Sequence, residues 1–352
     1  MESEYYQGIF YMIVANVIMI TSNFVVRDYD IRAVDAILAA GLVKFTLSLL
    51  FIVFTHNSCS REIMNSILKL INKSEYNEIG KREDEQSSLR EVVLASNLEE
   101  RKWIFLFGIC DAINETTRLA AIHFIPVSDF TLYATTVVIF TYIFGYFMIG
   151  IKPTILKTLP CLMLLIGISL TIKPIFIFSN DNLNRRIWRT GKKIVPQSDS
   201  MNDSLYWIGI LISLTYSVAS GIKRNIPKKC ANVQCVSFLL WSGFCILVTG
   251  VVSYYVQEMQ TGITNSSSLS HVKCLMIPGL GVASSAFHLL SVYANKIGCP
   301  VVNSVIRRSE ILFVIFVTIV YFKEYPDNIE AIGYCIVLIS VSLKIAVDKI
   351  DL

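Results

Sequence analysis

Charged side chains stand at helical spacing inside segments that are otherwise apolar. Asp111, Glu115 and Arg118 are separated by four and three residues, which places them on one face of a helix. An ionisable side chain within a membrane costs on the order of 3 kcal/mol, so such residues normally face a protein interior or a wet cavity. This face predicts a polar interior able to bind a charged solute or to pass a proton.

A second group near the C-terminus repeats this pattern. Asn303, Arg307 and Glu310 have the same spacing, whereas Lys44 has no carboxylate one helical turn away. The usual partners of a buried Lys or Arg are carboxylates and phosphates. Intramembrane positive and negative charges otherwise balance, so we expect Lys44 to await a ligand, and we expect that ligand to be an organic anion.

The candidate site residues fall into two groups by expected role. Those expected to bind substrate are Lys44, Arg118, Arg307, Asn303 and Tyr133. Those expected to gate or to couple transport are Glu115, His288, Glu310 and Asp129. In the alternative interpretation, Glu115 with Arg118 and Arg307 with Glu310 are ion pairs that only tie helices together, and Asp111 and Arg308 lie nearer the membrane surfaces.

The composition excludes an ordinary soluble enzyme. Of the 352 residues, 54% are hydrophobic and only 16% are charged, against about a quarter charged in soluble domains. The net charge of +4 lies mainly in segments between apolar blocks and indicates no nucleic-acid binding. No arrangement of nucleophile, base and orienting group and no metal-ligand cluster is present, so we predict no catalytic residues, no metal site and no enzyme activity.

The apolar blocks are each near the length that crosses a bilayer, about 20 residues. They predict an all-α integral membrane protein with about ten transmembrane helices. The expected spans are 8–26, 34–55, 102–123, 127–149, 155–178, 205–222, 234–257, 272–293, 299–322 and 328–347. Charged or polar segments at 56–101 and 179–204 separate some of them.

An internal repeat relates the two halves of the chain. An offset of 173 residues aligns 165–172 with 338–345 at Leu, Ile, Ser, Leu and Ile, and places Gly108 on Gly281. It also superposes the third to fifth spans on the eighth to tenth. We predict one five-helix repeat at 1–178, a connecting loop at 179–204 and a second repeat at 205–352. An odd number of spans per half inverts the second repeat, as in many secondary transporters.

The distribution of basic residues favours a cytoplasmic N-terminus and C-terminus. In that orientation the inner segments, mainly 56–102 and 223–234, carry more Lys and Arg than the outer segments. The glycosylation sequons at Asn202 and Asn265 then face the lumen or the exterior. We expect a multi-pass protein of the plasma membrane or of the endoplasmic reticulum and Golgi.

Two motifs resemble a known family. Ser128-Asp129-Phe130-Thr131 leads into 138–145, and Ile306-Arg307-Arg308-Ser309-Glu310 leads to Glu324. These segments resemble the two EamA repeats of the drug/metabolite transporter superfamily, and most of all subfamily G of solute carrier family 35. The first repeat departs from that pattern, with Thr136-Val137-Val138 in place of a Ser-Ser-Pro-like run and Gly150-Ile151 in place of a closing acidic residue.

The resemblance implies a ten-helix carrier that works by alternating access without a cofactor. We expect a secondary transporter or exchanger of small organic metabolites, with organic anions as the expected class, and with a proton or a counter-anion as a further partner besides the lipid bilayer. Two alternatives stay open. One is a nucleotide-sugar antiporter, and the other is a membrane adaptor that acts on a regulatory protein partner through 56–101. A homodimer is a further open arrangement.

Overall fold

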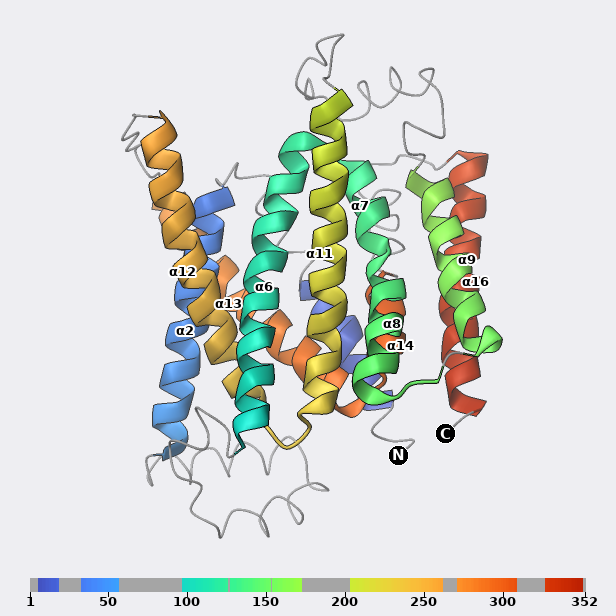
Figure 1. The fold of residues 1–352 in the computed structure, drawn as a ribbon, viewed down its shortest axis with the longest axis horizontal. Helices are drawn as coiled ribbons and strands as arrows, with labels where there is room; N and C mark the ends of the chain where they lie inside the picture. The colour runs from blue at the N-terminus through green and yellow to red at the C-terminus, as the bar shows by residue number, and fades with distance from the viewer. Residues whose placement is uncertain are drawn as a thin grey trace.

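The computed structural model of the chain describes residues 6–18, 33–56, 97–125, 127–152, 154–172, 203–261, 271–308 and 327–350. Every regular element in these ranges is an α-helix, and the helices run roughly side by side (Figure 1). The expected all-α fold is confirmed. The segments 56–101 and 179–204, predicted to be loops, lie largely outside the described residues.

The helices follow the predicted spans closely. Besides the helix Tyr6–Ile18, they are α2 (Ala33–His56), α6 (Leu98–Phe124), α7 (Val127–Thr135), α8 (Val137–Ile149), α9 (Ile155–Ile172), α11 (Asp203–Lys229), α12 (Cys235–Thr261), α13 (His271–Ile297), α14 (Pro300–Arg308) and α16 (Asn328–Ile350). Of the predicted span 299–322, the described part ends with α14. Glu310 therefore lies outside the described residues.

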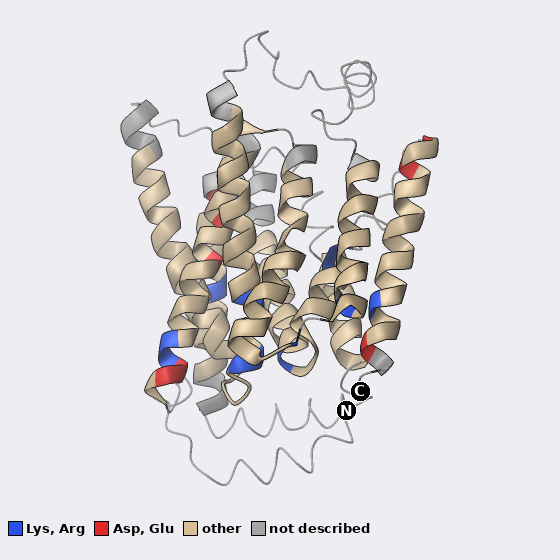
Figure 2. Cartoon of the chain, turned by 45° about the vertical axis from the view of Figure 1, so that its right-hand side comes forward, with Lys and Arg blue, Asp and Glu red and all other residues tan. Residues whose placement is uncertain are grey.

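The outer surface of the bundle is apolar. Phe147 and Ile155 are 75% and 88% exposed, and Figure 2 shows the charged residues confined largely to the bundle interior and the helix ends. In the part of the chain that the structure describes, three apolar stretches are long enough to cross a membrane, namely Leu132–Ile149, Cys235–Val256 and Asn328–Asp348, and three shorter apolar helices accompany them. A surface of this kind suits a lipid environment, where apolar side chains carry no penalty.

Two predicted spans differ from the observed helices. The span predicted to end at residue 222 continues as α11 to Lys229, so Lys223 and Arg224 belong to a helix rather than to a basic loop. The span predicted at 127–149 is broken at Thr136, between α7 and α8. Hydropathy ends a span at any charge pair, whereas here neighbouring helices bury those charges.

The helix bounds in the two halves correspond under the same 173-residue offset. Shifted by 173 residues, α6 coincides with α13 and α7 with α14, and α9 and α16 begin at equivalent positions. In Figure 1, α6 runs towards the upper edge and α13 towards the lower edge. The inverted repeat itself stays a prediction, and this correspondence supports it.

The α9–α16 pair packs through small residues at one side of the bundle (Figure 1). A methyl group added at Gly333 would lie 2.5 Å from Thr171 Oγ1 and 2.8 Å from Gly167 O, and one added at Gly167 would lie 2.9 Å from Val337. Only glycine therefore permits this approach. Close contact between small residues is the usual basis of helix association in membranes.

Candidate functional site

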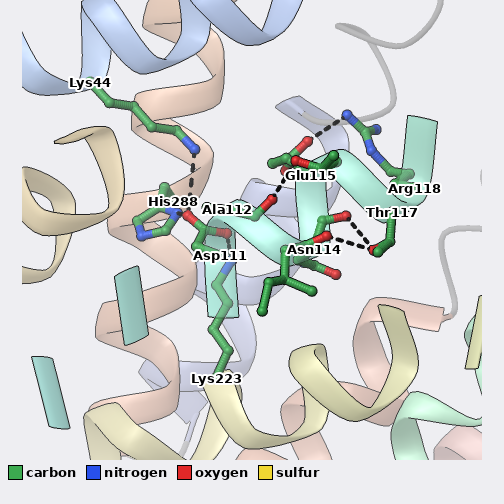
Figure 3. A network of polar contacts seen from close by, with 11 residues as sticks. Lys44, Asp111, Ala112, Asn114, Glu115, Thr117, Arg118, Lys223 and His288 are labelled. Atoms are coloured by element: carbon green, nitrogen blue, oxygen red, sulfur yellow. Dashed lines mark hydrogen bonds and ion pairs between the residues drawn. The ribbon is translucent and has the colours of Figure 1, made fainter. Parts of the chain in front are cut away.

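Asp111 on α6 lies at the centre of the polar interior (Figure 3). Its side chain is completely buried, and four other helices supply its partners. Lys223 of α11 pairs with Oδ1, and Ser242 of α12 donates its hydroxyl to Oδ2. His288 Nδ1 of α13 lies 3.3 Å from Oδ2, and Lys44 Nζ of α2 lies 3.8 Å from it. Five helices thus meet at one carboxylate.

Two glycines let the helices approach this carboxylate. A methyl group added at Gly243, next to Ser242, would lie 2.6 Å from the amide nitrogen of Phe45. One added at Gly108, a turn before Asp111, would lie 2.8 Å from Trp241 O. The backbone of α12 therefore lies directly against both α2 and α6 at the level of the site.

The charges around Asp111 do not cancel. Lys44 and Lys223 each bring one positive charge to a single carboxylate, so the group carries a surplus positive charge even with His288 neutral. A buried charge is tolerated only where an opposite charge and hydrogen bonds compensate it. The site consequently favours a further negative charge.

A small cavity adjoins the Asp111 group between α6, α11, α13 and α14. Among the described residues, its lining includes three cationic side chains and no acidic one. The lining residues are Phe107, Ser220, Lys223, Arg224, Phe287, His288, Ser291, Val292, Asn295 and Arg307. The free space holds about one water molecule. Hydroxyl, amide and cationic groups on aromatic walls form a lining suited to an organic anion.

Arg307 enters this cavity from α14 and lies over an aromatic wall. Its guanidinium carbon is 4.6 Å from the ring centroid of Phe287 on α13, and its side chain is buried. A guanidinium over an aromatic face is held in place by the attraction between the cation and the ring. The placement of Arg307 at the cavity agrees with its predicted role in substrate binding, which stays a prediction.

Polar side chains of other helices bind backbone carbonyls at the break between α7 and α8. Tyr133 O accepts hydrogen bonds from Thr136 N, from the Thr136 hydroxyl and from the Ser217 hydroxyl of α11. Ala134 O accepts one from Arg308 Nη2 of α14 at 2.7 Å. Non-helical backbone within a membrane is tolerated where protein covers it in this way.

Two expectations for this region need correction. Lys44 is not an unpaired cation, because Asp111 on another helix lies within 3.8 Å of it, and its role in substrate binding stays a prediction. Asp111, which the alternative interpretation placed nearer a membrane surface, is fully buried among five helices. Sequence spacing reveals partners only along one helix, and both errors come from partners on other helices.

The other predicted site residues are divided between the cavity and its surroundings. His288 and Arg307 line the cavity, while Glu115 and Arg118 form an ion pair of 2.8 Å with side chains 28% and 29% exposed, as the structural alternative expected. Asn303 donates to Ala294 O at 2.7 Å and so supports the turn between α13 and α14.

Tyr133 and Asp129 are not among the described residues that line the cavity. Tyr133 is partly buried and packs against an apolar cluster that includes Tyr216. Asp129 belongs to α7, but its side chain lies outside what the structure describes.

Sequence reasoning missed Lys223, Arg224 and Ser242. A signal for the first two was present in α11, where buried polar residues recur at helical spacing. These are Ser213, Ser217, Ser220 and Arg224. Such a stripe predicts a helix that continues through the charges. Ser242 stands alone among apolar neighbours and offered no comparable signal.

Comparison with known proteins supports the membrane assignment. No family model matches the sequence. The chain is similar to the uncharacterized membrane protein YMR253C of Saccharomyces cerevisiae, with 23% identity over 245 residues. The protein is a membrane protein. The aligned region covers 68% of this chain and 56% of the yeast protein, so the chain spans little more than half of that relative's length.

A solved crystal structure resembles the whole fold. It matches over 97% of both chains with a TM-score of 0.61 and 14% sequence identity. At this level of identity the likeness concerns the fold alone. The arrangement of helices described above therefore also occurs in an experimentally determined protein.

Proposed function

We propose that the protein is a secondary transporter that carries small organic anions by alternating access. The observation that carries this proposal is the buried cavity whose lining, among the residues that the structure describes, includes Lys223, Arg224 and Arg307 and no acidic side chain. Buried cationic groups in membrane helices mark substrate or ion pathways. Here they lie where helices of both predicted halves meet, which is where inverted-repeat transporters bind substrate.

The position of α11 strengthens the preference for an anion. The predicted span ended at residue 222, and with that boundary the intramembrane positive and negative charges balance. They then favour neither an anionic nor a cationic substrate. Lys223 and Arg224 add two positive charges to the interior. The carboxylate of Asp111 is shared between two lysines and offsets only part of this surplus.

Alternating access is supported by the relation between the halves. Helices α6 and α13 have equivalent bounds and run in opposite directions, and each contributes a residue to the Asp111 group. The resemblance of 306–310 to an EamA repeat agrees with this proposal, since Arg307 of that motif lines the cavity. With room for about one water molecule, the described conformation is a closed form that must open to admit a metabolite.

The ends of the helices favour a cytoplasmic location for the lower edge in Figure 1. Lys228 and Lys229 end α11 there, Lys296 ends α13, and Arg101 and Lys102 begin α6. Basic residues at helix ends prefer the cytoplasmic side. Both termini then lie in the cytoplasm, and glycosylation at Asn202 or Asn265, but not at Asn72, would agree with this orientation.

The test is uptake by liposomes that contain the purified protein. Labelled dicarboxylates and tricarboxylates are compared with a neutral sugar and an organic cation, with and without anion loaded on the opposite side. We expect saturable uptake of at least one anion and none of the controls, and Arg307→Gln should lower uptake at subsaturating substrate by about tenfold or more. Uptake of the cation with none of any anion would contradict the proposal.

The same assay separates a nucleotide-sugar antiporter from a carrier of simple carboxylates. Competition by a free nucleoside monophosphate, together with uptake of the matching nucleotide sugar, would favour the antiporter. If no carboxylate moves under conditions where the nucleotide sugar does, the proposed mechanism stands and the substrate class is corrected.

A further inference from the structure

We propose that Asp111 is an internal competitor of the substrate, whose carboxylate holds the lysines that the transported anion binds in the loaded carrier. This inference rests on the proposed function and concerns how the site changes between its empty and loaded forms. Asp111 was not among the residues predicted to bind or couple substrate. The proposal rests on the number, origin and charge of its contacts.

The first argument is that Asp111 already occupies the position of a bound anion. Its two oxygens are engaged by the ammonium group of Lys223, the hydroxyl of Ser242, the imidazole of His288 and the ammonium group of Lys44. Two ammonium groups, a hydroxyl and an imidazole are the groups that a protein uses to bind a free carboxylate. Here a carboxylate of the chain itself takes that place.

The second argument is that one anion does not satisfy this group. Lys44 and Lys223 share a single charge of Asp111, and Lys223 also faces the cavity that Arg307 lines. A substrate anion that enters the cavity therefore meets Lys223 while Asp111 still holds it. The stronger its contact with Lys223, the weaker the hold of Asp111 becomes.

The third argument is that the partners of Asp111 lie on helices from both predicted halves. Asp111 and Lys44 belong to α6 and α2, whereas Lys223 and His288 belong to α11 and α13. The bond between Asp111 and Lys223 consequently ties one half to the other. A ligand that releases this bond differs in affinity between the closed and open forms, which is what a shift of conformation requires.

Anion-dependent stabilisation of the purified protein tests this inference without knowledge of the natural substrate. The probes are citrate, succinate and inorganic phosphate, with glucose as the neutral control, and the readout is the midpoint of thermal unfolding in detergent. Ligand that binds the folded protein raises this midpoint by an amount that grows with the logarithm of its concentration divided by its dissociation constant. Asp111→Asn keeps the shape of the side chain and removes the competing charge.

We expect Asp111→Asn to lower the concentration of at least one probe anion needed to raise the midpoint by a fixed amount by about tenfold. The matched control is Asp348→Asn, which also removes the partner of a buried lysine, Lys344, but far along the chain on α16. This control should respond to the anions as the wild type does. Ser242→Ala, which removes only the hydroxyl bonded to Asp111, should shift the response in the same direction by about twofold to threefold.

Several results would overturn the inference. Asp111→Asn could respond to anions as the wild type does, or need more anion, and then Asp111 would not compete. A complete lack of anion response in both proteins would also overturn it, because two released lysines must create an anion site. If Asp111→Asn does not fold, an unchanged response in Ser242→Ala decides against the proposal.

Failure of the proposed function is distinguishable from failure of this inference. If the wild type transports none of the anions in liposomes and Asp111→Asn still binds them more tightly, the competition by Asp111 stands and the transport proposal falls. If the wild type transports anions and the Asp111→Asn response is unchanged, the transport proposal stands and the competition falls.

Discussion

Two buried lysine–aspartate groups in this protein differ in how many helices they join. Asp111 on α6 is bound by side chains of α2, α11, α12 and α13. Lys344 and Asp348, in contrast, lie one turn apart on α16 with 3.2 Å between Lys344 Nζ and Asp348 Oδ1. A pair within one helix survives any movement of that helix, whereas the Asp111 group changes whenever its helices separate.

The surroundings of the two groups also differ, in the balance of charge and in how the neighbouring helices pack. Around Asp111 the positive charges exceed the negative ones and a polar cavity adjoins them. Around Lys344 one lysine meets one aspartate, and the neighbouring packing of α9 on α16 depends on Gly167 and Gly333. We interpret the first region as the part that moves and binds, and the second as a support held by packing.

We expect the largest difference in stability between the variants in which Asp111 or Asp348 is replaced singly by alanine. Asp111→Ala leaves two lysines buried without their carboxylate and should lower the free energy of unfolding by about 3 to 5 kcal/mol. Asp348→Ala should cost less, about 1 to 2 kcal/mol, because only one lysine loses its carboxylate and Lys344 Nζ keeps the carbonyl of Lys157 as an acceptor. Thermal unfolding in detergent measures both, and equal losses would remove the distinction between the two groups.

In the α9–α16 region, we expect the packing of the two helices to contribute most of the stability. A methyl group added by Gly333→Ala meets backbone and side-chain atoms of Thr171, so we expect a loss of about 1 to 3 kcal/mol. Gly279→Ala on α13 is the matched control, since an added methyl group there has no neighbour within 4 Å.

The same two glycine variants sharpen the assignment of roles. Gly333→Ala should leave the response to citrate unchanged at temperatures where the protein stays folded, because the substitution is remote from the cationic cavity. A lowered affinity for the anion in this variant, at equal fraction folded, would show that the α9–α16 support takes part in binding.

The smallest effect is expected for Glu115 and Arg118. Their side chains are 28% and 29% exposed and pair within one helix, so a double-mutant cycle should give a coupling of about 1 kcal/mol or less. Glu115→Gln should leave anion uptake within about twofold of the wild type. A folded Glu115→Gln protein without uptake would instead support the predicted role of Glu115 in coupling.

Much of the fold followed from hydropathy and helical spacing. The expected bounds of α2, α6, α12 and α13 lie within a few residues of the observed ones, because these helices are long apolar blocks ended by polar residues. The break at Thr136 was missed, since neither proline nor glycine stands there and the break depends on Ser217 and Arg308 from other helices. Local sequence carries no record of such partners.

The candidate site was predicted in part. Arg307 and His288 were found because charged or titratable residues are rare in apolar segments, and both line the cavity. Lys223 was assigned to a loop because its neighbour Arg224 made the segment resemble a membrane border. The central role of Asp111 required the three-dimensional structure, since Lys44, Lys223, Ser242 and His288 are spread over most of the chain.

One measurement tests the central claim most directly, namely that the cationic cavity beside Asp111 binds a transported anion. Initial uptake of the best-transported anion is compared in liposomes that contain the wild type, Lys223→Gln or Lys344→Gln at equal amounts of folded protein. Both lysines are largely buried and both pair with an aspartate, but only Lys223 lines the cavity. We predict a loss of about tenfold or more at subsaturating anion for Lys223→Gln and uptake within about twofold of the wild type for Lys344→Gln. Unchanged uptake by Lys223→Gln, or an equal loss in both variants, would contradict the account.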